Sequence, residues 1–462
     1  MKDSIAQIVI ELIINLIKYF SAGGDVLTIA QMEKDLFPMI QEAVCKLISR
    51  YIEDVDERIR NDKKGRKEAG YAVERRHDLR TILTAIGLLS YGRTYYSNKD
   101  GGYEYLVDTA IEIDKYDRIS NGVSMALVGA ACDMSYAKSS EYTVDSALSR
   151  TTVMKHVRDR EPVRPPDVQE KRKVSALHID ADEAHVTMVG GDKSTVPLIS
   201  VYEGIEYKGK RGYCKNVFHI SEYGKAPEDL WIQVLNEVMA RYDIEDTTIY
   251  IHGDGAKWIK TGLEWFPGAI YVLDKYHKNK AITAMTVGLD KDARKVFNNE
   301  IHSALNDKDI RFFDELSGSL ISQLPEREEI INKSATYLLN HIDGIHICKM
   351  DPEANNGGCT EPHVAHILSR RLSSFPLAWS AESLKHLAPL LANGGNVALQ
   401  QKSHTRVVER MLKRATRGAR KAIKKIKFAP DPNSIGNVTA ISTGKVNQLY
   451  RTLNSISQQK II

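Results

Sequence analysis

Cysteine is scarce in this chain of 462 residues. The five cysteines are scattered and odd in number, and no two of them form a Cys-x-x-Cys pair. This usage excludes a disulfide framework of the kind that stabilises small secreted proteins. It predicts a protein of the reducing cytoplasm.

Long apolar runs are also missing. The most apolar stretch, "SIAQIVIELIINLIKYF" (4–20), is interrupted by Glu11 and Lys18. It is shorter than the roughly 20 apolar residues that a membrane-spanning helix needs. No basic leader or small-residue cleavage site frames it. The stretch therefore predicts a core or dimerisation helix, and we expect no membrane association.

Net charge is small, at +4, and the 42% hydrophobic and 27% charged residues are ordinary for a folded protein of two to four domains. The charge is unevenly distributed, however. The stretch 401–428 holds eleven Lys and Arg against one acid, Glu409. Such one-sided charge predicts binding to phosphate backbones, and an exposed basic helix without a partner is the alternative. The candidate DNA contacts in this basic C-terminal region, 401–462, are Arg406, Arg410, Arg414, Arg417, Arg420 and Lys424.

The first 160 residues predict helices around a hairpin. Apolar residues spaced by three and four predict a helical region at 1–70. The charged run 57–80 predicts a solvated linker or a nucleic-acid contact, and the apolar and polar alternation of 81–98 predicts a small hairpin. No internal repeat is visible in the chain.

Residues 121–159 predict helices in a helix-turn-helix layout, so that 71–160 reads as a DNA-binding region. Ser149 has the character of an N-cap for the second helix, in which Val153 and Val157 face inward. Arg150, Thr151, Thr152, Lys155 and His156 then face outward, and Arg150 and Lys155 are candidate DNA contacts. Plain packing of two helices explains the pattern equally well. The proline-rich and charged stretch 158–173 predicts a linker.

The predicted secondary structure changes from helices to strands after residue 173. Strand patterns at 174–182, 194–205 and 213–220 precede a helix at 226–241. Then "TTIYIHGD" and "AIYVLD" predict two further strands, each leading into a helix. This order predicts an α/β domain over 174–400, whose mixed sheet is antiparallel at its start and parallel in its second half. Residues 280–355 predict a mainly helical insertion, and Pro362 marks the first turn of a later helix.

Acids interrupt the first of these strands, in "SALHIDADEAHVTM" (175–188). Asp180 and Asp182 are two residues apart and so share one face of the strand. Asp254 ends a second strand between Gly253 and Gly255, which permit a sharp turn. Carboxylates gathered at one sheet edge repel one another unless a cation neutralises them, and their oxygens suit Mg²⁺ or Mn²⁺. Two such ions about 4 Å apart are the standard arrangement for phosphoryl displacement. Any one of these acids alone is also compatible with a turn or capping role.

Four segments together carry a resemblance. "HIDADEAHV", "IYIHGDGAKWIK", "YVLDKYHKNKAI" and "CTEPHVAHILSRRLSSFPLAW" resemble successive motifs of bacterial insertion-sequence transposases of the ISLre group, long catalogued as an uncharacterised protein family. The group is more distantly similar to Mutator-like transposases. The resemblance covers about residues 75–400. It implies a ribonuclease-H-like core, an acid triad of two aspartates and a glutamate, two divalent metal ions, and a helical insertion before the last acid.

The resemblance assigns residues as follows. It implies that Asp182, Asp254 and Glu361 are the catalytic, metal-holding acids, with Asp180 as the reserve candidate for the first of them. Pro362 departs from the small residue that the family often has after the glutamate. Asp274 and His277 match an Asp-x-x-His motif and are expected to support the active site or contact DNA, although a helix-start acid and a satisfied core histidine are equally compatible. Lys257 and Lys260, in the second motif, are further candidate DNA contacts.

The expected function is therefore a DNA transposase that cleaves DNA at the ends of its element and transfers the strands into target DNA. We expect it to work on the nucleoid as a dimer or larger homo-oligomer. A catalytically inactive DNA-binding protein and a nuclease acting on RNA or replication intermediates are the alternatives. A zinc site formed by His346, Cys348, Cys359, His363 and His366 is a rival hypothesis, although their spacing matches no common zinc module.

Overall fold

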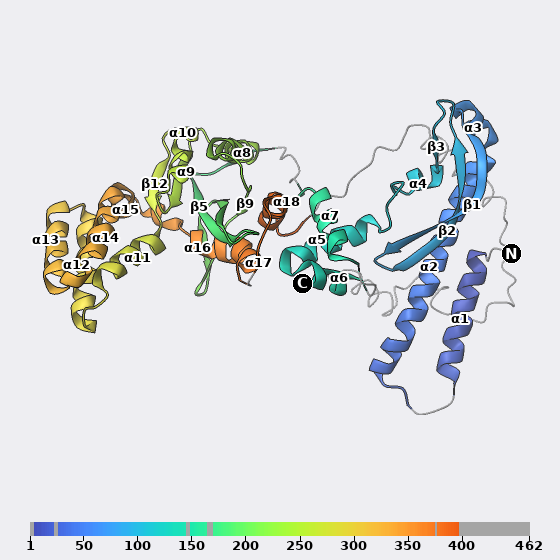
Figure 1. Ribbon diagram of the computed structural model, residues 1–462, viewed down its shortest axis with the longest axis horizontal. Coiled ribbons are helices and arrows are strands. Elements are labelled where there is room, and N and C mark those ends of the chain that lie inside the picture. The colour runs from blue at the N-terminus through green and yellow to red at the C-terminus, as the bar shows by residue number, and fades with distance from the viewer. Residues whose placement is uncertain (1–3, 23–25, 145–147, 164–169, 375–376, 397–462) are drawn as a thin grey trace, which may run out of the picture. The chain divides into compact units, whose positions relative to one another are not determined.

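The structure is a computed structural model, described here for residues 4–22, 26–144, 148–163, 170–374 and 377–396 (Figure 1). The chain forms two compact units. In the described residues, the first unit comprises the chain up to Arg80 together with Ser90–Tyr116. The second comprises Thr81–Leu89 and the chain from Asp117 onward. The predicted basic region 401–462 lies outside the described residues.

The first unit begins with helices, which confirms the helical prediction for 1–70. Each helix has an N-cap side chain, Ser4, Thr28 or Asp62, that accepts a hydrogen bond from a backbone N–H three residues further on. The first helix packs along the second and buries Ile8. The three helices are α1 (Ile5–Ser21), α2 (Ile29–Asn61) and α3 (Lys63–Ala69).

A three-stranded sheet follows, in the order β1 (Ala72–Thr84), β2 (Gly87–Ser97) and β3 (Tyr103–Glu104), and leads into α4 (Leu106–Ala110). The predicted hairpin at 81–98 is confirmed, but its first strand starts at Ala72. The prediction of a linker at 57–80 is therefore wrong, because this run ends α2, forms α3 and begins β1. Some of its charge is used inside the fold, since buried Arg80 donates to Asp108 at 2.8 Å.

The second unit is built on a mixed five-stranded sheet in the order β12-β11-β5-β6-β9. The strand β6 runs antiparallel to β5 and β9, whereas β5, β11 and β12 are parallel to one another. The predicted antiparallel start and parallel second half are thus confirmed. The strands are β5 (Ala176–Thr187), β6 (Lys193–Tyr202), β9 (Phe218–Ile220), β11 (Thr248–Gly253) and β12 (Ile270–Leu273).

Alternation along β5 separates the two faces of this sheet. Leu177, Ile179 and Ala181 share a core with Trp231 and Val234 of α8 (Pro227–Arg241). His178, Asp180 and Asp182 therefore project from the opposite face. The strand continues five residues beyond its predicted end at 182, so Asp182 lies within β5 and not at its terminus. The segment 255–266, predicted as one helix, instead forms α9 (Lys257–Lys260) and α10 (Gly262–Trp265). Gly262 lies so close to Trp231 of α8 that a side chain there would overlap the ring.

Shorter strands complete this region. One small hairpin and one two-stranded parallel pair flank the main sheet. They are β7 (Ile205–Lys208) with β8 (Arg211–Cys214), and β4 (Arg172–Lys173) with β10 (Tyr242–Asp243).

The helical insertion predicted at 280–355 is confirmed, and its helices share a core of their own around Ile301, Phe313 and Ile331. It leaves the sheet after β12 and returns before Glu361, so it adds bulk without interrupting strand pairing. Its helices are α11 (Lys275–Thr286), α12 (Lys291–Asp307), α13 (Ile310–Gln323), α14 (Glu328–Asn340) and α15 (Ile342–Met350).

The helices at 121–159 pack against the far end of the β5-β6 pair, in one core with the last helices of the described chain. The sequence analysis grouped them with the hairpin in one region, 71–160, but this core places them with the sheet. Short π-helical and α-helical segments continue α16 up to Leu372. The helices of this core are α5 (Asn121–Asp133), α6 (Tyr136–Thr143), α7 (Arg150–Asp159), the π-helical segment Val364–Ser369, α17 (Arg370–Leu372) and α18 (Ala381–Ala392). The short helix α16 (Thr360–His363) directly precedes the π-helical segment.

Details of α7 mostly follow the prediction. Ser149 accepts the N-cap bond from Thr152, and Val153 and Val157 are buried. The expectation that His156 faces outward is wrong, because its Nδ1 lies 2.9 Å from Ser124 Oγ.

The predicted linker 158–173 is only partly described. Residues 164–169 lie outside the described chain. At its start, Arg160 is buried and donates to Ser124 and Asn121. Among the helices that the structure describes, none combines the length and apolarity needed to span a bilayer.

Candidate active site

The register of the parallel strands aligns three aspartates at the same edge of the sheet. Residues of β11 follow their β5 partners by 72 positions (248 − 176 = 72), and Asp254 follows Asp182 by the same number. Residues of β12 follow their β11 partners by 20 positions (270 − 250 = 20), and Asp274 follows Asp254 by 20. Asp182, Asp254 and Asp274 thus stand side by side across adjacent parallel strands, just beyond the last paired residues of β11.

The turn after β11 allows this approach. A Cβ on Gly253 would lie 2.9 Å from the Ala181 carbonyl oxygen, so only glycine lets β11 run this close to β5. Gly255 has a φ of +91°, and a Cβ there would meet His341 Nε2 at 2.0 Å. Asp254 sits between the two glycines, and its carboxylate accepts a bond from the Ala256 N–H at 2.8 Å.

Glu361 reaches the same place from α16. The preceding residue, Thr360, donates its hydroxyl to Asp274 Oδ2 at 2.6 Å, which fixes the start of this helix beside the aspartates. Glu361 lies in the first turn, where the helix dipole favours an acid. A π-helical segment, Val364–Ser369, follows immediately, and such segments are frequent at functional sites. The side chain of Glu361 is 40% exposed, so it has room to move.

His277 lies between these acids. Its Nδ1 is 3.4 Å from Asp274 Oδ1, and its Nε2 is 3.9 Å from Glu361 Oε1. The contact with Asp274 raises the pKa of His277 above its usual value, burial opposes this, and the charges of Asp182 and Asp254 add to the rise. Burial alone would raise the pKa of Asp274, but the bonds to His277 and Thr360 bring it below its usual value.

Asp182 is buried among like charges. Its pKa is raised to about 6, chiefly by burial, and the charges of Glu361 and Asp254 add to the rise. A bond from the Glu183 N–H and the nearby His277 act in the opposite direction. The structure thus brings together all three predicted acids and both predicted support residues, Asp274 and His277.

Asp180 has a different environment from Asp182. Its carboxylate accepts hydrogen bonds from the Tyr202 hydroxyl at 2.9 Å and from the Cys359 N–H at 2.7 Å, and a third comes from the Gly358 N–H at 3.2 Å. Asp180 therefore holds the loop that leads into Glu361. Its oxygens are occupied by protein donors, which makes it a positioning residue for Glu361 and leaves Asp182 as the better candidate for the first acid.

Aromatic rings form a buried layer beneath this loop. His178 stacks between Tyr202 and Tyr250 at ring-centroid distances of 5.6 and 5.1 Å, and its Nδ1 lies 3.0 Å from His252 Nε2. A Cβ on Gly357 would lie 2.3 Å from His252 Nε2, so the loop needs glycine there. Burial lowers the pKa of His252 to about 3, which keeps the ring neutral.

Sequence reasoning did not identify Tyr202, Thr360 or Tyr337 as parts of the site. Tyr337 of the insertion donates its hydroxyl to the Asp254 carbonyl at 2.8 Å and so supports the turn after β11. Thr360 stood inside a quoted motif, but nothing in that motif indicated a bond to a residue 86 positions earlier. Tyr202 reads as an ordinary apolar strand residue, and only the pairing of β5 with β6 shows its partner.

Metal binding depends on the donor chemistry of this group. Among the residues that the structure describes, no group of three or more His, Cys, Asp or Glu side chains is arranged to hold a metal ion. The donors at the site are nevertheless carboxylate oxygens of the kind that Mg²⁺ and Mn²⁺ prefer. Their mutual repulsion at Asp182 is the kind that a cation relieves.

The residues of the rival zinc hypothesis fall in two places. His346 Nδ1 lies 2.7 Å from the Asn306 carbonyl oxygen inside the helical insertion. His363 Nε2 instead lies 3.6 Å from Cys214 Sγ, and its other nitrogen faces Asp180 at 3.7 Å. The described structure therefore gives the zinc hypothesis no support.

The predicted DNA contacts are only partly within the described chain. Arg150 and Lys155 are exposed on α7, and Lys257 and Lys260 are exposed on α9, directly after Asp254. Their accessibility is compatible with phosphate contacts, which stay a prediction. The six predicted contacts between Arg406 and Lys424 lie outside the described residues.

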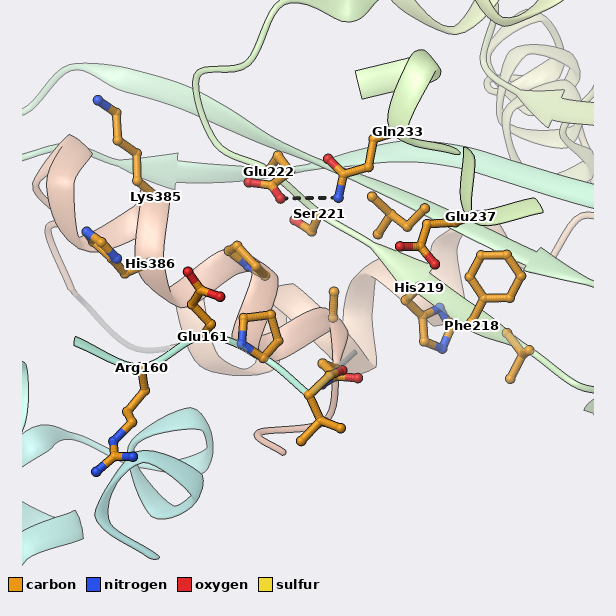
Figure 2. Close-up of a pocket in the computed structure, with 18 of the residues that line it drawn as sticks. Arg160, Glu161, Phe218, His219, Ser221, Glu222, Gln233, Glu237, Lys385 and His386 are labelled. Carbon is orange, nitrogen blue, oxygen red and sulfur yellow. Dashed lines mark hydrogen bonds between the residues drawn. The ribbon is translucent and has the colours of Figure 1, made fainter. Parts of the chain in front are cut away.

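A cavity of about 520 Å³ lies elsewhere in the second unit, between β9, α8 and α18 (Figure 2). Acidic and basic side chains line it, including Glu222, Lys385 and His386. The Gln233 amide donates a hydrogen bond to Glu222 at 3.3 Å. Neither Asp182, Asp254 nor Glu361 is among its lining residues. This cavity is therefore separate from the carboxylate group.

Comparison with known proteins gives a family without an assigned activity. Residues 23–410 match the uncharacterised protein family UPF0236. One UPF0236 protein of Caldanaerobacter subterraneus subsp. tengcongensis is 36% identical over 453 residues, which is 95% of this chain and 96% of the relative. A second, whose name joins eleven gene designations of that organism, is 36% identical over 442 residues, covering 93% and 92% of the two chains. The chain belongs to the uncharacterised protein family UPF0236.

Proposed function

We propose that this protein is a DNA transposase that hydrolyses phosphodiester bonds at the ends of its element and joins the freed 3′ ends to target DNA. One observation carries the proposal. Asp182 and Asp254 stand side by side on adjacent parallel strands, and α16 delivers Glu361 to His277 beside them. These are the three acids that the resemblance to ISLre-group transposases selects.

The architecture supports the same proposal. A ribonuclease-H-like core requires an antiparallel start to the sheet and parallel strands that carry the acids, and the sheet of the second unit has both. The helical insertion lies between the second and third acids, as in the family that the sequence resembles. Its core is separate from the sheet, so the insertion can be accommodated without displacing Asp254 or Glu361.

The residues of the site would have separate roles in this reaction. Asp182, Asp254 and Glu361 would hold two Mg²⁺ or Mn²⁺ ions, which supply charge stabilisation at the attacking and leaving oxygens. Asp274 orients His277, whose raised pKa favours the protonated ring beside Glu361. A protonated His277 can therefore hold Glu361 in place or contact a phosphate oxygen. Asp180 and Tyr202 fix the loop that carries Glu361.

Exposed cations would hold the DNA. Lys257 and Lys260 follow the Asp254 turn directly, where they can meet the phosphates that flank the cleaved bond. The basic stretch 401–428 would add sequence-independent affinity. Two element ends must be processed together, so we propose a dimer or larger assembly on DNA.

Gene multiplicity among relatives supports a mobile element. One relative's name joins eleven gene designations within a single organism, and another joins four. Copies scattered through one genome are what repeated transposition leaves behind, whereas a housekeeping enzyme has no need of them.

One observation favours an alternative, a DNA-binding protein without catalytic activity. The carboxylates are close, but in the described residues they do not form a group arranged to hold a metal ion. A protein that had lost catalysis could keep the sheet and the basic surface while this geometry relaxed. The two functions differ in their dependence on divalent ions.

A cleavage and joining assay separates them. Purified protein is incubated with DNA carrying the inverted repeats of the neighbouring genomic element, a target plasmid, and Mg²⁺ or Mn²⁺ in increasing concentration. We expect metal-dependent nicking at the repeat ends followed by joined products, and no product with the Asp254→Asn variant. DNA binding without cleavage at every metal concentration would support the alternative, and cleavage without joining would indicate a nuclease.

A further inference from the structure

The helix α1 has two apolar faces, and the structure covers one of them. Ile8, Leu12, Asn15 and Tyr19 recur at spacings of four, three and four, and Ile8 is buried where α1 packs along α2. This stripe accounts for the contact between the two helices. It uses less than half of the circumference of α1.

A second stripe runs along the opposite side. Ala6, Ile10, Ile13, Ile17 and Phe20 recur at spacings of four, three, four and three, which is the pattern of a helix-packing seam. The four large side chains of this seam are 50–60% exposed. The two charged residues of α1, Glu11 and Lys18, each follow a seam residue by one position and therefore point away from it.

The exposed apolar area is too large for a monomer surface. Twelve apolar residues of the α1-α2 hairpin are each 38–97% exposed. Together they expose an area on the order of 1,000 Å², of which the seven residues on α1 expose roughly 700 Å². The largest apolar patch of a typical monomer is about 300–600 Å², and each partner of a standard interface contributes about 800 Å². The residues are Ile5, Val9, Ile10, Ile13, Ile14, Ile17, Phe20, Val26, Leu27, Ile29, Phe37 and Ile40.

We propose that the α1 seam is a homodimerisation surface, on which α1 of a second copy packs antiparallel about a twofold axis near Ile13. Antiparallel packing about this axis brings Ile13 close to its own copy and Ile10 close to Ile17, so the seam is complementary to itself. Because the seam lies opposite the face that packs on α2, the two α1 helices meet at the centre of the dimer and each keeps its contact with its own α2. No charge enters the contact, because Glu11 and Lys18 lie off the seam. The proposal does not depend on the chemistry proposed for the second unit.

Sedimentation of the full-length protein tests the surface. We expect the wild type to be a dimer at micromolar concentration. The Ile13→Glu variant sets two like charges against each other at the twofold axis, and we expect its dimer dissociation constant to rise at least 100-fold. Val296→Glu is the matched control, because Val296 is similarly exposed, at 53%, on α12 of the other unit. We expect it to remain a dimer, with circular dichroism confirming that both variants are folded.

Cysteine cross-linking tests the orientation. In the antiparallel pair, Ile13→Cys places two thiols near each other across the axis, and mild oxidation should give a covalent dimer that Val296→Cys does not give. A wild-type monomer at all concentrations would overturn the proposal, since another part of the chain would then cover the seam. Monomers that bind anionic lipid vesicles through α1 would also overturn it and assign the surface to a membrane interface.

Discussion

Asp180 and Asp182 lie two residues apart on the same face of one strand, yet their surroundings differ. Asp180 is surrounded by donors, namely the Tyr202 hydroxyl and the N–H groups of Gly358 and Cys359. Asp182 has one backbone donor, from Glu183, and is otherwise near the acids Asp254 and Glu361. Burial raises the pKa of both carboxyls, and that of Asp180 lies well above its usual value. The two residues differ in their partners, because protein donors occupy the oxygens of Asp180, whereas those of Asp182 have fewer donors and remain available for a ligand.

The difference arises where β11 ends. Asp180 lies in the last residue pair between β5 and β11, opposite His252, and is covered by the loop before Glu361. Two residues later β11 has turned away at Gly255, so Asp182 is buried among Asp254, Glu361 and His277 and not under this loop. Position along the strand therefore separates a positioning role from a proposed catalytic one.

The largest expected effect is on activity. Asp182→Asn keeps the shape of the side chain but removes its charge, so we expect cleavage of element-end DNA to fall by about 1,000-fold or more with DNA affinity unchanged. Glu183→Gln is the matched control, because Glu183 is the neighbouring acid on the other face of β5. Rates are measured on repeat-end DNA at saturating Mg²⁺. Normal activity of Asp182→Asn would remove it from the triad.

The next largest expected effect is a loss of stability when the hydrogen bonds of Asp180 are removed. Asp180→Ala leaves the Tyr202 hydroxyl and the Cys359 N–H buried without this acceptor, whereas the Gly358 N–H keeps its bond to the Tyr202 oxygen. We expect a loss of about 2–5 kcal/mol in the free energy of unfolding. Tyr202→Phe removes one donor with its bonds and should cost about 1 kcal/mol. Urea unfolding measures both. An Asp180→Ala variant as stable as the wild type would refute the structural role given to this residue.

Asp182→Asn should change stability in the opposite direction. Its pKa is raised from 3.8 to about 6, so the folded state binds the proton more tightly than the unfolded state does. Stability is therefore lost as the pH rises from 3.8 to 6, and it stays lost at neutral pH. The neutral asparagine avoids this loss, and we expect a gain of about 1–3 kcal/mol at pH 7. Unfolding at pH 4 should show little difference between variant and wild type.

The smallest effect concerns His277. Because its folded pKa is raised, the stability that it contributes is fully present below pH 6.5 and is lost as the pH rises through the folded pKa. We expect His277→Gln to remove this component, which is below about 1 kcal/mol. Thermal unfolding between pH 5.5 and 8 measures it as a flatter dependence of Tm on pH. Parallel profiles for variant and wild type would show that His277 is not coupled to the acids.

Local patterns predicted much of the fold. Alternation and apolar spacing predicted the main strands, the insertion helices and the N-cap at Ser149, because these depend on residues close in sequence. The prediction of a linker at 57–80 was wrong, since a charged side chain such as Arg80 finds its partner, Asp108, 28 positions away. The prediction that His156 faces outward was wrong for the same reason, because the hydrogen bond to Ser124 of another helix holds the ring inward.

The sequence by itself determined which side chains could bind a metal ion and how many residues separate them along the chain. The spacing of 72 residues between Asp182 and Asp254 equals the offset between paired residues of β5 and β11. The spacing of 20 residues between Asp254 and Asp274 equals the offset between paired residues of β11 and β12. Only the tertiary structure decided that Asp180 is surrounded by hydrogen-bond donors while Asp182 lies among acids, and that His277 lies between Asp274 and Glu361. The physical reason is that burial and charge act through space, so the environment of a carboxylate depends on strand ends and loops from distant parts of the chain.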